Sequence, residues 1–195
     1  MAGPGPPRYR GRFAPSPTGP LHFGSLVAAV GSWADARANR GDWLVRMEDL
    51  DPPRESPGAA GEILRVLATL GLEWDEQVSY QSARAQAYDT ALASLQRRGA
   101  VFACACTRKE IADSAIGGPD GSLVYPGTCR DGLPPGRAVR ATRVRVASAA
   151  IEFRDAVQGL VRQDVARDVG DFVLVRADRL FAYQLAVVVD DAAQG

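Results

Sequence analysis

Lysine and histidine are almost missing from this chain of 195 residues: Lys109 and His22 occur once each, and the other positive side chains are arginines. The lysine type of nucleotide-binding loop needs the pattern GxxxxGK[ST], in which the lysine reaches the phosphates. Because Lys109 lies in no such pattern, the chain does not contain this loop. A polyanion would have to be held by local patches of other groups.

Cysteine, net charge and long apolar runs are scarce as well. The three cysteines are odd in number and two of them are separated by one residue, which is a poor disulfide framework and favours a reducing compartment. The 23 positive and 23 negative side chains balance, so no overall basic field attracts nucleic acid. No apolar run, 185–189 included, approaches the length that spans a membrane. We therefore expect a cytoplasmic protein without membrane attachment.

A proline-rich segment at 12–25, RFAPSPTGPLHFGS, organises the rest of the chain. Its prolines exclude regular structure, and apolar residues at helical spacing follow it: Leu26, Val30, Trp33 and Ala34. The pattern predicts a strand, a tight turn and a helix, with Gly41 as the C-cap glycine. Free N–H groups at a helix start bind anions; His22 would add a ring donor, and Gly24 would let a nucleobase lie flat against the backbone. An ordinary proline-rich connection is the alternative.

Two predicted strands, 9–14 and 42–48, flank this helix, and together they form a βαβ unit with parallel strands. Ligands of such sheets bind at the carboxyl ends of the strands. The segments 12–16 and 48–51 both lie at that edge, so we expect them to meet in one crevice. Amphipathic helices at 57–70 and 82–98 are interpreted as scaffold, and Ser82 is the expected N-cap of the second.

The segment 12–25 resembles the class I aminoacyl-tRNA synthetases. Its end, HFGS, is similar to the His-x-Gly-His signature, with Ser25 in place of the second histidine, and the whole run resembles the glutamyl branch. A second segment, 46–55 (RMEDLDPPRE), also resembles that branch, and its PPRE end resembles one subfamily, the glutamyl-queuosine tRNA(Asp) synthetases. From its own residues alone, Glu48 is more simply explained by a solvated acidic loop.

The resemblance implies an α/β fold: a Rossmann-type class I synthetase catalytic domain with a β-rich, zinc-containing inserted subdomain. It also implies a monomer that activates L-glutamate with ATP and Mg2+ and transfers the glutamyl group to queuosine in tRNA(Asp). By resemblance, Arg12 would pair with the side-chain carboxylate of glutamate. The implied glutamate-binding residues are Arg12, Phe13, Ala14, Pro15, Ser16, Glu48 and Tyr183. The implied ATP-binding residues are Thr18, His22 and Gly24.

Three cysteines predict a metal site. Cys104 and Cys106 end a predicted strand at 101–106, where alternate side chains face the same way, and Cys129 follows a glycine-rich loop. Zinc binds thiolates in tetrahedral geometry. The residues leave the fourth ligand open between Tyr125, Asp131 and a water molecule, and three buried thiols without a metal are the alternative. The glutamyl-queuosine family has a Cys-x-Cys…Tyr-x-x-x-Cys zinc site, which implies the set Cys104, Cys106, Tyr125 and Cys129.

Short β-rich pieces fill the region 137–179 and predict a small inserted subdomain, where the family places its insertion for the tRNA acceptor end. Four arginines there are candidates for phosphate contacts, although a solvated strand face explains each one equally well: Arg137, Arg140, Arg143 and Arg145. The run 181–191, FAYQLAVVVDD, fits either a strand or a helix. We expect three parts: 1–100 as the first half of the nucleotide-binding domain, 101–170 as the zinc-containing insertion, and 171–195 as the return to the core.

The family's second ATP loop, of Lys-Met-Ser-Lys type, does not occur in these 195 residues, and a further pocket arginine is expected beyond them. We therefore expect an N-terminal part of the enzyme, truncated before the second half of its catalytic domain is complete and poorly active by itself. A shortened ordinary glutamyl-tRNA synthetase is the close alternative. A non-catalytic zinc-stabilised module that binds tRNA or nucleotide is the alternative from another class.

Overall fold

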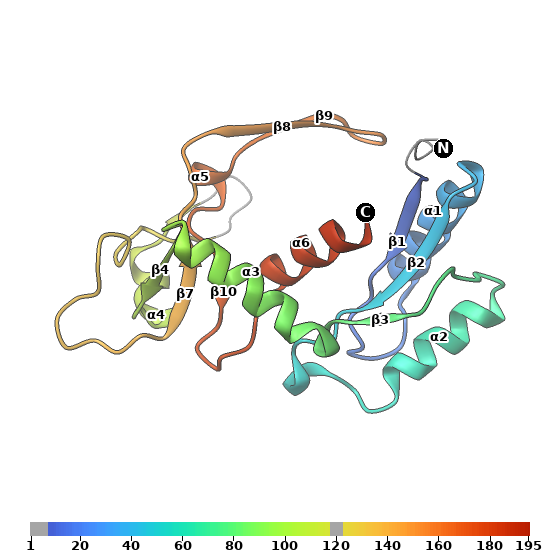
Figure 1. The fold of residues 1–195 in the computed structure, drawn as a ribbon, viewed down its shortest axis with the longest axis horizontal. Coiled ribbons are helices and arrows are strands. Elements are labelled where there is room, and N and C mark those ends of the chain that lie inside the picture. The colour runs from blue at the N-terminus through green and yellow to red at the C-terminus, as the bar shows by residue number, and fades with distance from the viewer. Residues whose placement is uncertain (1–7, 118–122) are drawn as a thin grey trace, which may run out of the picture. The chain divides into compact units, whose positions relative to one another are not determined.

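The computed structural model describes residues 8–117 and 123–195 and divides the chain into two compact units (Figure 1). Unit 1 contains the described residues up to Ala85 together with Ala192–Gly195, and unit 2 contains Gln86–Asp191. Among the described residues, no helix has the length and apolar character that a membrane crossing requires. The three-part division at residues 100 and 170 stays a prediction.

Unit 1 is built around a parallel sheet of three strands in the order β1-β2-β3, which are Arg10–Phe13, Asp42–Met47 and Ser79–Tyr80. Its helices are α1 (Phe23–Ala38) and α2 (Ala59–Thr69), with a 3-10 turn at Pro52–Arg54. Strand β2 is buried from Trp43 to Met47, as a central parallel strand should be. The predicted βαβ unit is confirmed, because β1 and β2 pair in parallel through α1, with Phe13 opposite Val45.

Helix α1 packs on the sheet through small residues, and this corrects the predicted apolar stripe. Ala29 and Ala36 are fully buried, whereas Val30 is 48% exposed. A Cβ atom on Gly11 of β1 would lie 3.0 Å from the Cβ of Ala36 and 3.0 Å from the carbonyl oxygen of Ser32. The helix therefore approaches the strand too closely for large side chains at these positions. Of the predicted stripe, Trp33 packs partly buried against the core, whereas Val30 and Ala34 are exposed.

Gly41 does not cap α1 as predicted. The C-cap is Asn39, and the residue with a positive φ is Arg40, at 52°. Gly41 is required for another reason, since a Cβ atom there would lie only 2.3 Å from the carbonyl oxygen of Tyr9. The glycine thus permits the close pass of β1 and the chain entering β2.

The predicted N-cap role of Ser82 is also wrong. Helix α3 (Ala85–Arg97) is preceded by a 3-10 turn at Gln81–Arg84, which contains Ser82. The backbone N–H and the hydroxyl of Ser82 both donate to the carboxylate of Asp49, at 2.9 and 2.5 Å. Ser82 therefore fastens the chain after β3 to the loop after β2.

Unit 2 contains an antiparallel sheet of three strands in the order β10-β7-β4, which are Val173–Val175, Ala141–Val144 and Val101–Cys104. Two strand pairs accompany it: β5–β6 (Ile116–Gly117, Leu123–Val124) and β8–β9 (Ala150–Asp155, Gly159–Asp164). Besides α3, the helices are α4 (Arg108–Ser114), α5 (Val165–Asp168) and α6 (Tyr183–Gln194), the last of which ends in unit 1. The strands predicted in 137–179 correspond to β7, β8, β9 and β10.

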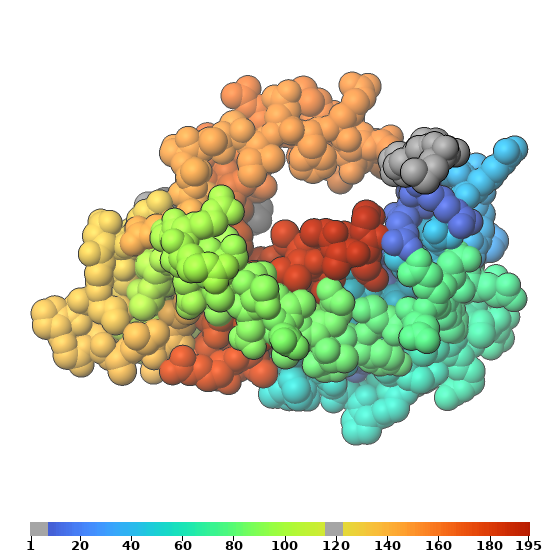
Figure 2. Space-filling view, in the orientation of Figure 1, coloured from blue at the N-terminus to red at the C-terminus, as the bar shows by residue number. Residues whose placement is uncertain are grey.

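The run 181–191, which the sequence left open, is mainly helix α6. Its side chain Asp190 is buried and accepts a hydrogen bond from Tyr88 Oη at 2.8 Å, while Tyr88 meets Phe181 edge-on. By contrast, the β8–β9 hairpin is exposed: Phe153 is 54% and Leu160 is 65% accessible. Figure 2 shows the hairpin as an arm, coloured orange.

Candidate functional site

The loops that follow β1 and β2 lie against each other at the carboxyl edge of the sheet. The N–H of Glu48 donates to the carbonyl of Pro15 at 2.9 Å, and the N–H of Ser56 donates to the carbonyl of Pro17 at 3.0 Å. The hydroxyl of Ser56 also donates to the carbonyl of Thr18, at 2.9 Å. The expected meeting of the segments 12–16 and 48–51 is therefore confirmed.

Charged side chains gather at this edge. Arg12, next to the end of β1, donates through Nη2 to the carbonyl of Gly195. Arg46 and Glu48 form an ion pair with 3.3 Å between Nη2 and Oε1, and their side chains are only 2% and 7% exposed. Arg46 also donates through Nη1 to Oε1 of Gln194 at 2.7 Å. Glu48 is therefore a buried, paired carboxylate, and the explanation by a solvated acidic loop is wrong.

His22 forms the N-cap of α1. Its Nδ1 accepts a hydrogen bond from the N–H of Ser25 at 3.2 Å, which leaves Nε2 as the donor of the neutral ring. The ring is exposed. A Cβ atom on Gly24 would lie 3.1 Å from Cε1 of His22. Gly24 thus makes room for the imidazole itself, a role that the sequence did not suggest.

The other predicted substrate residues differ in accessibility. Phe13 is buried and stacks on Trp43 with 6.3 Å between ring centroids, so only its backbone is available to a ligand. Ala14 and Pro15 are half-buried in the loop, whereas Ser16 and Thr18 are exposed. Tyr183, at the start of α6, is 57% exposed and belongs to unit 2. The role of Tyr183 in binding glutamate stays a prediction.

Three thiols converge in unit 2, where β4 ends. The Sγ atoms of Cys104, Cys106 and Cys129 all lie within 4.8 Å of one another, and those of Cys106 and Cys129 are 3.6 Å apart. The hydroxyl of Tyr125 lies 3.5 Å from Sγ of Cys104 and 3.7 Å from Sγ of Cys106, and it accepts the N–H of Cys129 at 2.8 Å. Within the described ranges, Asp131 does not join this group.

These distances fit one tetrahedral zinc ion. With Zn–S bonds of about 2.3 Å, two thiolates on one zinc lie about 3.8 Å apart, and a thiolate and an oxygen ligand lie about 3.5 Å apart. The separations of Cys106 from Cys129 and of Tyr125 from the two nearest sulfurs agree with these values. The donor set therefore suits zinc, with Tyr125 better placed than Asp131 as the fourth ligand.

Burial and hydrogen bonding shift the pKa values of the groups in this cluster in different directions. Burial raises the pKa of Cys106 to about 11. Burial also acts to raise the pKa of Cys104, but hydrogen bonds with Tyr125 and with the N–H of Cys106, and the nearby Arg143, together lower it below its ordinary value. The pKa of Tyr125 is raised, first by burial and then by its contact with Cys104. Cys104 is thus more easily converted than Cys106 to the thiolate that binds metal.

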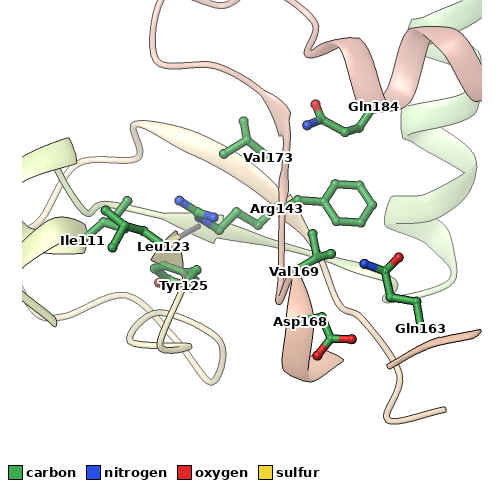
Figure 3. A pocket seen from close by; sticks show the side chains of 10 residues that line it. Ile111, Leu123, Tyr125, Arg143, Gln163, Asp168, Val169, Val173 and Gln184 are labelled. Atoms are coloured by element: carbon green, nitrogen blue, oxygen red, sulfur yellow. The ribbon is translucent and has the colours of Figure 1, made fainter. Parts of the chain in front are cut away.

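A pocket of about 490 Å³ borders this cluster, and Tyr125 and Arg143 are among the residues that line it (Figure 3). Arg143 is 7% exposed, so the prediction that it contacts phosphates is wrong for this residue. Its guanidinium carbon lies 3.9 Å from the centroid of the Tyr125 ring. The strand register could have suggested this place, because Arg143 pairs with Phe102, two residues from Cys104 on the same face.

Comparison with known proteins identifies the fold and its family. The model of the family "tRNA synthetases class I (E and Q), catalytic domain" matches residues 8–116. The chain belongs to this family. A class I synthetase of known structure, a glutamate tRNA ligase from Elizabethkingia meningosepticum in complex with its amino acid, superposes with a TM-score of 0.80 at 26% identity. The match covers 96% of this chain and 42% of that protein.

Curated relatives are more similar in sequence. The glutamyl-Q tRNA(Asp) synthetase of Dechloromonas aromatica is 65% identical over 188 residues, which are 96% of this chain and 62% of that protein. The proteins of the same name from Aromatoleum aromaticum and Chromobacterium violaceum are 60% and 62% identical, over 97% and 96% of this chain and 59% and 62% of their own length. This class I synthetase chain thus spans about three fifths of the relatives that it matches.

Proposed function

We propose that this chain belongs to an enzyme that activates L-glutamate with ATP and Mg2+ and transfers the glutamyl group to queuosine in tRNA(Asp). The observation that carries the proposal is the 60–65% identity to three proteins named glutamyl-Q tRNA(Asp) synthetase, over 96–97% of the chain. Glutamate tRNA ligases of known structure are only 26% identical. The queuosine-directed reaction is therefore favoured over the charging of tRNA(Glu).

The activation step needs no covalent enzyme nucleophile. The α-carboxylate of glutamate attacks the α-phosphate of ATP in line, which forms glutamyl-adenylate and releases pyrophosphate; queuosine then displaces AMP. The protein has to align the reactants and stabilise the charge that develops on the phosphate. The edge of the parallel sheet in unit 1 suits this task, because two loops with charged side chains are held together there.

The proposed glutamate site is built on Arg12. Its planar guanidinium can pair with the side-chain carboxylate of glutamate through two parallel hydrogen bonds. Glu48 would accept hydrogen bonds from the α-ammonium group, and its ion pair with Arg46 orients this carboxylate. Ser16 and Tyr183 would complete the amino-acid end. Phe13, Ala14 and Pro15 would contribute backbone groups.

The proposed ATP site is the start of α1. The free N–H groups of a helix N-terminus and its dipole favour phosphate. His22 would donate from Nε2, since its Nδ1 is engaged by the N–H of Ser25. Thr18 is exposed beside it, and Gly24 allows the imidazole ring to lie against the helix start. Mg2+ would bridge the phosphates.

We also propose that Cys104, Cys106, Tyr125 and Cys129 hold a zinc ion. The support is the convergence of three thiols and one hydroxyl at distances that suit tetrahedral coordination. This zinc would act structurally, since it would tie the loop around Cys129 to the end of β4. The thiolate ligands would come from segments separated by a glycine-rich loop. The sequence of this loop has little apolar content to stabilise it without the metal.

A charging experiment tests the function. The full-length protein is incubated with ATP, labelled glutamate and separate tRNAs, with Arg12→Ala as the matched variant. We expect label only on tRNA(Asp) that contains queuosine, none on tRNA(Asp) without it, and a strong loss of glutamate-dependent pyrophosphate exchange in the variant. Label on tRNA(Glu) would instead indicate an ordinary glutamyl-tRNA synthetase. Absence of any adenylate formation would indicate a non-catalytic binding module.

A further inference from the structure

Arg143 is a buried cation with an incomplete set of partners. It lies in the middle of β7 and is 7% exposed. Its Nη1 donates to the carbonyl of Asp171 at 2.7 Å, but Nε is buried and has no hydrogen-bond partner within 8–117 and 123–195. Over the same ranges, no carboxylate lies within ion-pair distance of it. A guanidinium withdrawn from water is costly unless a negative charge lies nearby.

The groups that face Arg143 belong to the thiol cluster. Its guanidinium carbon is 3.9 Å from the centroid of the Tyr125 ring, and Figure 3 shows the two side chains together. Phe102, the cross-strand partner of Arg143, also stacks on Tyr125, with 6.3 Å between ring centroids. Cys104 follows on the same face of β4, diagonally across from Arg143. Arg143 therefore touches the tyrosine and approaches the first thiol.

The net charge of a zinc–thiolate centre explains why a buried cation would lie beside it. A zinc ion with three thiolates carries a net charge of about −1, and an anionic oxygen ligand makes it more negative. Buried anions need a compensating cation. Arg137 also lies close to the cluster, but it is exposed and paired with Glu110 at 2.9 Å. Arg143 is the buried positive charge that such a site requires.

We propose that Arg143 is a positioning residue of the metal site, which holds the Tyr125 oxygen toward the thiols and balances the negative charge of the loaded centre. The proposal rests on the zinc site proposed above. It assigns to Arg143 an effect on metal affinity and on tyrosine coordination, without direct contact with the metal. Outer-shell partners of metal ligands commonly change metal affinity by about 10- to 100-fold when they are replaced.

The test is a zinc titration of the purified, reduced chain against a competing chelator, with ultraviolet difference absorption to report tyrosine bound to metal. Arg143→Met should weaken zinc binding by about 10- to 100-fold and reduce the tyrosine signal toward that of Tyr125→Phe. Arg143→Lys keeps the charge and should restore part of both. Arg145→Met is the matched control, because Arg145 directly follows β7 and its guanidinium lies over the Phe102 ring at 5.1 Å; both readouts should stay unchanged.

A second readout separates positioning from simple structural support. If Arg143 only packs, Arg143→Met lowers the melting temperature equally in zinc and in chelator; the proposal predicts a larger loss in zinc. Should Arg143→Met fail to fold, Arg143→Gln, which also removes the charge, takes its place, and zinc affinity equal to that of the unsubstituted chain would overturn the proposal. So would a folded Arg143→Met with unchanged affinity and tyrosine signal. An unsubstituted chain that binds no zinc would refute the metal site itself. Zinc binding with no tyrosine signal would refute Tyr125 as a ligand and, with it, the positioning role of Arg143.

Discussion

The backbone N–H of Glu48 donates to the carbonyl oxygen of Pro15 at 2.9 Å. This bond joins the loop after β1 to the loop after β2, although the two residues lie 33 positions apart in the sequence. It continues the parallel pairing of the strands past their ends, where regular pairing stops at Phe13 and Val45. Two parts of the proposed glutamate site, 14–16 and Glu48, are therefore carried on loops that are joined to each other.

The role of His22 can be divided into capping and ATP binding. His22→Ala removes the acceptor for the N–H of Ser25 and should cost about 1 kcal/mol of unfolding free energy, measured by urea denaturation. His22→Asn retains an acceptor at the cap but loses the ring donor. We expect both variants to bind ATP several-fold more weakly by calorimetry, with only the alanine variant markedly less stable. Normal ATP affinity in His22→Asn would contradict the proposed contact.

Removal of metal should weaken the fold. With zinc bound, chelation should lower the melting temperature by at least about 5 °C, since a ligand that binds only the folded state stabilises it. Cys129→Ser should abolish tight zinc binding and make the melting temperature insensitive to chelator. Thr128→Ala, at the exposed neighbouring position, is the control and should behave like the unsubstituted chain. Equal zinc content in the two variants would argue against Cys129 as a ligand.

Replacing two glycines of the first βαβ unit with alanine should have opposite effects on the free energy of unfolding. At Gly41 the added Cβ would lie 2.3 Å from the carbonyl oxygen of Tyr9, so Gly41→Ala should destabilise the chain by more than about 2 kcal/mol. Gly31 lies in α1 with no atom within 4 Å of such a Cβ, so Gly31→Ala should stabilise it by about 0.5–1 kcal/mol. Urea denaturation of both proteins checks this, and similar midpoints would contradict the close contact at Tyr9.

The carboxylate of Asp75 should make stability depend on pH. It accepts hydrogen bonds from the N–H of Trp43 at 2.8 Å and from Nη1 of Arg37 at 2.7 Å, and these interactions, the Trp43 bond first, lower its pKa. A folded-state pKa below the unfolded value means that the stabilisation is present above the unfolded pKa, about 4, and is lost as pH falls through the folded pKa.

The comparison of Asp75→Asn with the unsubstituted chain measures this effect. Urea midpoints recorded from about pH 6 down to about pH 3 should converge at the acidic end, because the carboxylate advantage disappears there. Asp113→Asn, at an exposed position of α4, should show no such convergence. A constant difference between Asp75→Asn and the unsubstituted chain at all pH values would show that the ionised carboxylate contributes nothing.

Local pattern predicted the first elements of the chain. Proline and glycine placement predicted the break between β1 and α1, and apolar runs predicted β2 and α2. Pattern failed where the cause was a close approach between remote segments. Gly41 looked like a helix cap because a cap is the commonest local reason for a glycine after a helix, whereas its role depends on Tyr9, 32 residues earlier.

The sequence by itself determined the βαβ opening, the two loops expected at one sheet edge, and the group of three thiols; Tyr125 was implied by the family resemblance. These depend on spacing along the chain, which is visible in the sequence. Tertiary structure alone decided that Ala29 and Ala36 face the sheet and that Glu48 is paired with Arg46. It also decided that Arg143 is buried against Tyr125. Burial and pairing of a charge depend on the strand that lies alongside, and no local pattern specifies that neighbour.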